Sequence, residues 1–127
     1  MKLTDNFDSF EFNCKDGTIV PNELYSNMVE LAKNLQVLRD ELGKPVRINS
    51  AYRTPKYNKK VGGASKSQHL LCKAADIVVA GVTPTEVAET IERLIKEKKM
   101  MQGGIGIYNT FTHYDIRGVK ARWNFTK

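Results

Sequence analysis

The sequence predicts one α+β domain over residues 1–127, built from a mostly antiparallel sheet with packed helices. Two apolar stripes at helical spacing and several short alternating or β-branched segments carry this prediction. A chain of 127 residues fits one domain with one core. Its 41% hydrophobic and 27% charged residues are ordinary for a globular protein. No repeat, low-complexity tract or linker divides it.

Two amphipathic helices are expected. The first ends at Gly43 and Pro45, which stop a helix in the usual way. The second begins at Thr83, which caps it, with Pro84 at the first helical position and Glu86 closing a capping box. The buried residues recur every three or four positions: Leu24, Met28, Leu31, Leu35, Leu38 and Leu42 in the first helix, and Val87, Ile91, Leu94 and Ile95 in the second.

Four strands are expected, and the last two form a hairpin. Residues 46–50 alternate apolar and polar side chains, and residues 75–80 are short, apolar and β-branched. Residues 105–108 and 111–117 flank a turn at Asn109-Thr110. Ahead of the first helix, three aromatic residues are expected to pack the opening segment onto the core: Phe7, Phe10 and Phe12.

A loop-like stretch separates the first two strands. It runs from Tyr52 to Gln68 and contains Thr54-Pro55 and Gly62-Gly63. Loops of this length in a compact domain usually carry function. We therefore expect this stretch to contribute to a site.

The net charge of +6 is concentrated in one part of the chain. Eight Lys and Arg residues lie between Lys44 and Lys73, with no acid before Asp76. Such a tract is either a solvated face or a surface for a polyanion, such as nucleic acid or an anionic cell wall. Only Tyr52 and Tyr57 supply aromatic rings there, too few for a single-strand binding groove. We predict no nucleic-acid partner.

The remaining bulk features concern compartment and assembly. No stretch approaches 18 apolar residues, so no membrane association is predicted. The first 17 residues lack the apolar segment of a signal peptide, so the chain is expected to be cytoplasmic as synthesised. Cys14 and Cys72 are expected to be free thiols under those conditions. A monomer is expected.

Each of the two histidines is followed closely by an aspartate, and such a pair can bind a metal. His69 precedes Asp76 by seven residues, and His113 precedes Asp115 by two on a predicted strand, where both side chains share a face. Zinc accepts imidazole and carboxylate ligands, and catalytic sites keep three protein ligands. His69, Asp76 and His113 suit such a site. Spacing alone also permits ordinary structural roles for each residue.

Three segments resemble one family of enzymes. Residues 67–76 (SQHLLCKAAD) resemble the SxHxxGxAxD signature of zinc D-alanyl-D-alanine carboxypeptidases, whose core fold is shared with phage L-alanyl-D-glutamate endolysins and hedgehog domains. Residues 50–54 (SAYRT) resemble the family's S-G/A-Y-R-T/S segment, and residues 113–117 (HYDIR) resemble a His-x-Asp variant of its third motif. The resemblance runs from Ser50 to Trp123.

The resemblance implies a zinc ion on His69, Asp76 and His113. It implies that Arg53 binds substrate and stabilises the oxyanion of the reaction. Ser67 and Arg117 are candidates for substrate binding, although Ser67 would serve equally to turn the loop and Arg117 to form a surface ion pair. The implied substrate is a peptidoglycan stem peptide, and the implied reaction is hydrolysis of an amide bond. The protein would reach this substrate after release or export from the cytoplasm.

Two departures from the family pattern bear on catalysis. Many relatives carry an acid three residues before the last histidine ligand, where this chain has Thr110. We therefore assign the general base to Asp115, with two alternatives: Asp115 binds zinc while His113 is the acid and base, or Asp115 only orients a ligand. Cys72 replaces the signature glycine and is expected to be a small core residue. The rival function is a non-catalytic, zinc-stabilised module that binds wall or protein.

Overall fold

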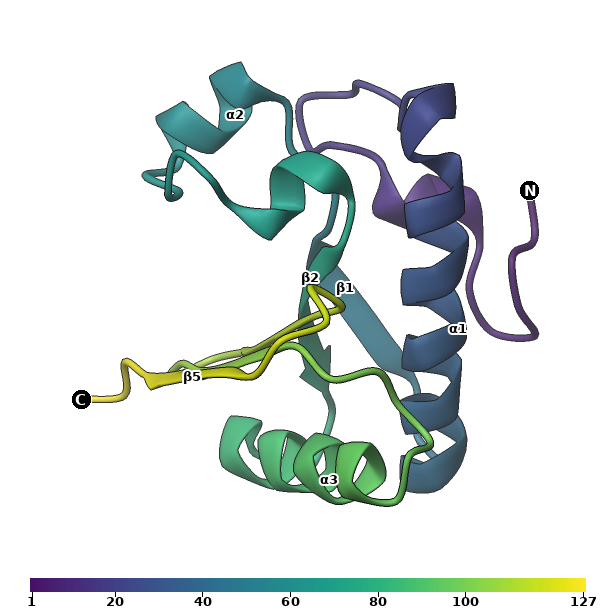
Figure 1. Cartoon of the computed structure of the whole chain (residues 1–127), viewed down its shortest axis with the longest axis vertical. Coiled ribbons are helices and arrows are strands. Elements are labelled where there is room, and N and C mark those ends of the chain that lie inside the picture. Colours follow the sequence, from purple (N-terminus) through teal and green to yellow (C-terminus); the bar gives the residue numbers. More distant parts are fainter.

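A five-stranded sheet forms the centre of this computed structural model, which describes residues 1–127 (Figure 1). The strand order is β1-β2-β4-β3-β5, and every neighbouring pair is antiparallel except the parallel pair β3 and β5. The predicted α+β class is confirmed. The strand bounds are β1 Val46–Ser50, β2 Ala74–Val79, β3 Gly104–Ile107, β4 Thr112–Asp115 and β5 Ala121–Asn124.

Three α-helices and three short 3-10 helices surround the sheet. The two predicted helices are present as α1 and α3, and α1 ends at Gly43, whose φ of 64° is the left-handed conformation that glycine adopts without strain. The Thr83–Glu86 capping box of α3 is formed. None of the helices has the length and apolar character needed to cross a membrane. The bounds are α1 Tyr25–Leu42, α2 Pro55–Lys60, α3 Pro84–Lys96, η1 Ser9–Phe12, η2 Asn22–Leu24 and η3 Gln68–Leu71.

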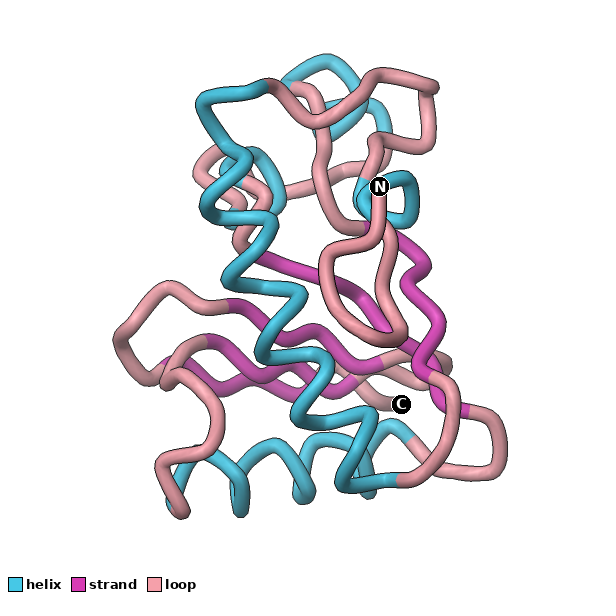
Figure 2. The backbone as a smooth tube through the Cα atoms, turned by 90° about the vertical axis from the view of Figure 1, so that its right-hand side faces the viewer, coloured by secondary structure: helices cyan, strands magenta, loops and turns pink.

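One face of the sheet packs against α1 and α3 and makes the core. In Figure 2, α1 crosses in front of the strands and α3 runs beneath them. The Tyr114 hydroxyl donates a hydrogen bond to Met101 O at 2.7 Å, and its oxygen lies 3.4 Å from Asn34 Oδ1 of α1. Thr112 donates through its hydroxyl to Pro84 O at the start of α3. These bonds hold β4 at a fixed height between the two helices.

The other face of the sheet carries a row of residues that crosses four strands. Asp76 on β2 lies opposite His113 on β4, His113 opposite Gly106 on β3, and Gly106 opposite Trp123 on β5. Residues at matched register share a face, so all four point away from the core helices. The polar residues of the predicted site therefore lie on the face of the sheet that α1 and α3 leave uncovered.

The structure differs from the sequence-based expectations at three places. Phe7 and Phe12 are buried as expected, but Phe10 is 69% exposed because η1 turns it outward between them. The stretch from Tyr52 to Gln68 is not a plain loop, since it contains α2. The strand β5 was not predicted, and β4 ends at Asp115 rather than at residue 117.

Candidate metal centre and cleft

Three side chains from separate elements converge on one point. His69 comes from η3, Asp76 from β2 and His113 from β4, and all three are buried. Their candidate ligand atoms lie within 4.8 Å of one another. Asp76 Oδ1 is 3.3 Å from His69 Nε2 and 3.1 Å from His113 Nδ1. The sequence-based grouping of these three residues is thus matched by their positions in the fold.

Local structure explains how His69 reaches the sheet. Ser67 caps η3, since its hydroxyl accepts a hydrogen bond from the His69 N–H at 3.2 Å. The carbonyl of His69 accepts from the Arg53 N–H at 3.0 Å, which ties η3 to the end of β1. Ser67 therefore turns the loop, which is one of the two roles expected for it. It also lines the cleft described below, where the other role, substrate binding, would be performed.

The outer nitrogens of both imidazoles decide where the protons lie. His69 Nδ1 is 2.7 Å from the carbonyl oxygen of Ala51, and His113 Nε2 is 2.7 Å from Asp115 Oδ2. Both partners are acceptors, so each of these outer nitrogens carries a hydrogen, and the inner nitrogens that face Asp76 Oδ1 are the ones that can give up a hydrogen to bind a cation. With those hydrogens released, three lone-pair-bearing atoms face one another and are stabilised by a cation between them.

The spacing of these atoms suits zinc. Tetrahedral ligation with bonds of about 2.0–2.1 Å places neighbouring ligand atoms about 3.3 Å apart. The two distances from Asp76 Oδ1, 3.3 and 3.1 Å, match that edge. The donor set of two imidazoles and one carboxylate therefore fits a single divalent ion.

The electrostatics of the centre keep its carboxylate charged. Burial alone acts to raise the pKa of Asp76, but hydrogen bonding to His113 and His69 outweighs it and holds the pKa far below its usual range. Burial likewise acts to lower the pKa of His113, and its two carboxylate partners raise the pKa instead. The charged Asp76 carboxylate favours a positive charge at this point, and a metal ion that binds there must displace the proton from His113 Nδ1.

Asp115 lies behind His113, away from the point of convergence. Its side chain is fully buried, and its two oxygens accept hydrogen bonds from His113 Nε2, the Gly104 N–H and the Arg117 guanidinium at 2.7–2.9 Å. Burial acts to raise the pKa of Asp115, but these donors hold it well below its usual range. In this position Asp115 fixes the ring of His113 and its proton, as an acceptor behind a metal-binding histidine does.

Two glycines of β3 make room for this arrangement. A Cβ on Gly104 would come within 3.0 Å of the Asp115 carboxylate, and one on Gly106 within 3.0 Å of the Trp123 indole. Because both glycines lack a side chain, the carboxylate and the indole lie directly on the strand. The Trp123 ring consequently packs against His113, with 4.9 Å between ring centroids.

Arg53 is held beside the centre by three contacts. It donates to Ser50 Oγ at 3.1 Å, to Asn58 Oδ1 at 3.2 Å and to Asp76 Oδ2 at 3.3 Å. Asn58 is itself buried and donates to Ala64 O, so it joins α2, the following turn and Arg53. The sequence pointed to Arg53 but not to Asn58, which reads as an ordinary helix residue.

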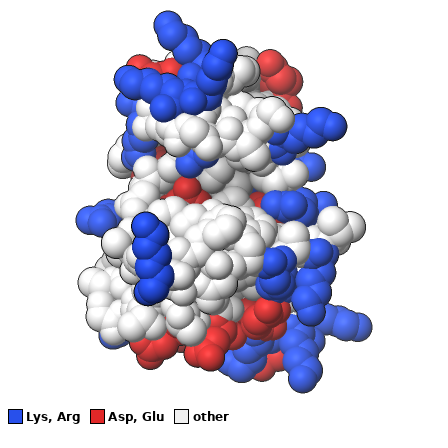
Figure 3. Space-filling model, turned by 90° about the vertical axis from the view of Figure 1, so that its left-hand side faces the viewer, with Lys and Arg blue, Asp and Glu red and all other residues white.

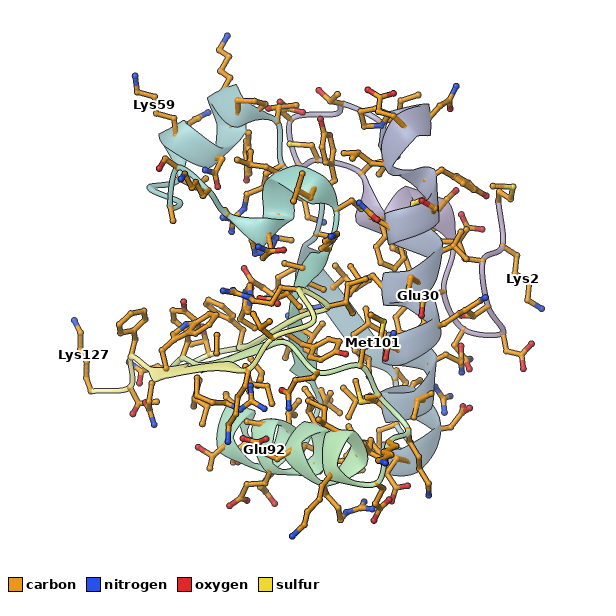
Figure 4. All side chains as sticks on the ribbon, in the orientation of Figure 1. Lys2, Glu30, Lys59, Glu92, Met101 and Lys127 are labelled. Atoms are coloured by element: carbon orange, nitrogen blue, oxygen red, sulfur yellow. The ribbon has the colours of Figure 1, made fainter.

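The centre opens into a cleft of about 550 Å³ between two walls. Figure 3 shows this side of the molecule, with a hollow across its middle and Lys and Arg side chains gathered above it. In Figure 4, Lys59 of α2 and Lys127 beyond β5 mark the outer ends of the two walls. The lining residues include Arg53, Val61, Lys66, Ser67, Gln68, Tyr108, Phe111, Arg117, Trp123 and Phe125 around His69, Asp76 and His113.

The lower wall is aromatic. Tyr108 stacks on Phe111 with 4.3 Å between centroids and meets Phe125 edge-on at 5.5 Å, while Trp123 donates through Nε1 to the Tyr108 hydroxyl at 2.9 Å. The sequence analysis missed this wall. Alternation from Gly104 through Gly106 was the available signal, since it places residue 108 on the same face as His113.

The cleft contains no second carboxylate beside Asp76. Asp76 is the sole carboxylate that lines the cleft, and Thr110, which stands where many relatives carry an acid, is exposed at the hairpin turn. Arg117 lies beyond β4 and forms a two-pronged ion pair with Asp115, while its guanidinium sits 5.6 Å from the Trp123 ring. Arg117 thus combines the ion-pair role with a place at the edge of the cleft.

Cys72 belongs to the core and not to the centre. It has a φ of 55°, the left-handed conformation that a glycine at this position of the signature accommodates more easily. Its side chain is fully buried, and burial raises the pKa of the thiol to about 12. Cys14 is also buried, and both thiols are free.

An α+β domain with two histidines and a carboxylate converging in an open cleft has the donor set of a mononuclear metal centre. The sequence matches the family model for Peptidase M15 over residues 5–115. The chain belongs to this family of metallopeptidases, and the predicted family membership is confirmed. A search of curated proteins found no match.

Proposed function

We propose that this protein is a zinc-dependent peptidase that hydrolyses an amide bond in peptidoglycan stem peptides. The observation that carries the proposal is the convergence of His69 Nε2, Asp76 Oδ1 and His113 Nδ1 at the floor of an open cleft. Membership of Peptidase M15 supports the reaction class. The cationic upper wall supports an anionic substrate, since Lys66 and Arg53 line it.

The metal supplies a Lewis acid that polarises the scissile carbonyl and acidifies a water molecule. His69 and His113 would bind the metal through their inner nitrogens, because Ala51 O and Asp115 hold hydrogens on the outer ones. Arg53, fixed by Asp76 and Asn58, places a permanent positive charge beside the carbonyl oxygen that becomes negative. These groups are in position before substrate arrives.

Asp115 acts through His113 in this proposal and does not abstract a proton from the attacking water. Our sequence-based assignment favoured the general base, but the side chain is fully buried and both its oxygens are engaged by donors. A base must reach the proton it removes. The orienting role, one of the alternatives considered, agrees better with these contacts.

The substrate class sets where the protein acts. Peptidoglycan lies outside the cytoplasm, so we propose that the protein works on the cell wall after release or export. All three metal ligands come from one chain, so the centre is complete in a monomer.

Mass spectrometry of stem peptides after digestion tests the reaction. Wild-type protein with zinc should release one defined fragment, and a chelator should abolish its release. His113→Ala serves as the inactive control, since it removes one ligand of three. Cleavage that persists with chelator, or in His113→Ala, would contradict a metal-dependent mechanism.

Metal binding itself has an optical test. Trp123 is the only tryptophan of the chain and packs against the ligand His113. Titration with Cu²⁺, which quenches nearby fluorophores, should quench its emission with one equivalent, and a chelator should reverse the effect. His69→Ala should weaken the quenching although residue 69 lies on η3, in the opposite wall. Equal quenching in His69→Ala would contradict a shared ion.

A second candidate function follows from the lack of a free carboxylate in the cleft. A zinc-stabilised module that binds wall peptides without cutting them needs no base, and the cleft lining contains none besides Asp76. Wild-type protein that binds zinc and stem peptide but releases no fragment over days would favour this function over the peptidase.

A further inference from the structure

The hydroxyl of Tyr108 has an unused hydrogen. Trp123 Nε1 donates to this oxygen at 2.9 Å, and an indole nitrogen is only a donor. The phenol hydrogen is therefore not shared with Trp123, and the hydroxyl makes no other hydrogen bond in the chain. Tyr108 lines the cleft, so its O–H is available to a ligand there.

The position of this hydroxyl is fixed by its surroundings. The Tyr108 ring stacks on Phe111 and meets Phe125 edge-on. The backbone N–H of Tyr108 also donates a hydrogen bond to Phe111 O at 3.1 Å. Trp123, which anchors the oxygen, lies over Gly106 and against His113. The donor is thus joined to a metal ligand through one ring and one hydrogen bond, with little freedom to move.

The two guanidinium groups at the cleft are each paired with a carboxylate. Arg53 donates to Asp76 and Arg117 to Asp115. Arg53 stands on the upper wall with η3, whereas Tyr108 stands on the lower wall with the sheet. A peptide lying in the cleft would meet a charged donor on one side and a neutral, fixed donor on the other.

We propose that Tyr108 is a catalytic residue that donates a hydrogen bond to the carbonyl oxygen of the scissile amide, opposite Arg53. This inference rests on the proposed peptidase function. A fixed neutral donor strengthens its bond as negative charge develops on that oxygen, without first being reorganised. No proton is transferred, so the step needs no further reactant.

Tyr108→Phe tests the proposal because it keeps the ring and its stacking and removes only the hydroxyl. We expect kcat on a stem peptide to fall about 100-fold, as for loss of one preorganised donor. The affinity of the metal-free variant for the same peptide, followed by Trp123 emission, should fall about two- to tenfold, as for one neutral hydrogen bond. Cu²⁺ quenching of Trp123 should stay as in wild type.

Tyr57→Phe is the matched control, since Tyr57 lies on α2 and does not line the cleft. It should leave kcat and peptide affinity unchanged. If Tyr108→Phe does not fold, Trp123→Phe replaces it: the Tyr108 oxygen loses its anchor, and kcat should fall while Tyr108 remains. Unchanged turnover in the folded variant overturns the inference.

The outcomes separate this inference from the proposed function. Wild-type cleavage together with normal kcat and affinity in Tyr108→Phe overturns the role of Tyr108 alone. A wild-type protein that neither cleaves nor binds stem peptide overturns the proposed function, and the inference with it.

Discussion

Replacing Asp115 with Asn should weaken both metal binding and the fold. Asn keeps the shape of Asp, but one of its two acceptor oxygens becomes an NH₂ group that cannot accept a hydrogen bond. At least one of the donors that now bind Asp115, among them His113 Nε2 and Arg117, would therefore lose its acceptor. The change also leaves the Arg117 charge without its partner. Breaking a buried ion pair costs about 3–5 kcal/mol, and the 28% exposure of the Arg117 side chain places this case near about 3 kcal/mol.

The metal affinity gives a second magnitude. Loss of the acceptor behind a metal-binding histidine lowers affinity about 10- to 100-fold. Denaturant unfolding measures the first quantity, and zinc competition against a chromophoric chelator measures the second. Glu92→Gln is the control: it breaks an Arg–carboxylate pair with Arg122 whose Glu92 side chain is 48% exposed. That loss should stay below about 1 kcal/mol and leave zinc affinity unchanged.

The result that would refute this reasoning is specific. If Asp115→Asn abolished turnover while zinc affinity and unfolding free energy stayed at wild-type values, Asp115 would be transferring a proton. The general-base assignment would then be restored. Loss of zinc affinity together with stability supports the orienting role.

Three further outcomes are expected. Gly106→Ala should displace the Trp123 indole, shifting its emission and costing about 1–3 kcal/mol in denaturant unfolding, as overpacking does; unchanged emission would contradict the close packing. Cys14 and Cys72 should resist a thiol reagent in the folded protein and react at once in guanidinium, because both are buried; rapid labelling of native protein would show an open core. Thr83→Ala should cost about 1 kcal/mol of stability by removing the cap of α3, with zinc affinity unaffected.

The elements that sequence analysis predicted correctly are those with local signals. The stripes of α1 and α3, the stop at Gly43 and the capping box at Thr83 each depend on residues a few positions apart. The candidate ligands His69, Asp76 and His113 were grouped by chemistry and by resemblance to a known signature. Asp76 and His113 meet because β2 and β4 pair in register, and His69 joins them from η3, which is tied to the end of β1.

The elements that were missed depend on distant contacts. The strand β5 is four residues long and pairs with β3 because Trp123 fits over Gly106, a match that neither segment shows by itself. Gly104 and Gly106 lie within β3 and provide space for the side chains of Asp115 and Trp123, which no local pattern reveals. Sharing a face with His113 did not say which nitrogen of the ring Asp115 meets, and the fold places it at Nε2.

The stretch from Thr54 to Lys66 forms the upper wall of the cleft and contributes no metal ligand. One wall of the cleft is therefore separable in sequence from the residues proposed to bind the ion. Shortening, lengthening or exchanging this stretch offers a route to proteins that accept different peptides around an unaltered centre. Asn58, which ties the stretch to Arg53, is the one residue such a graft must retain.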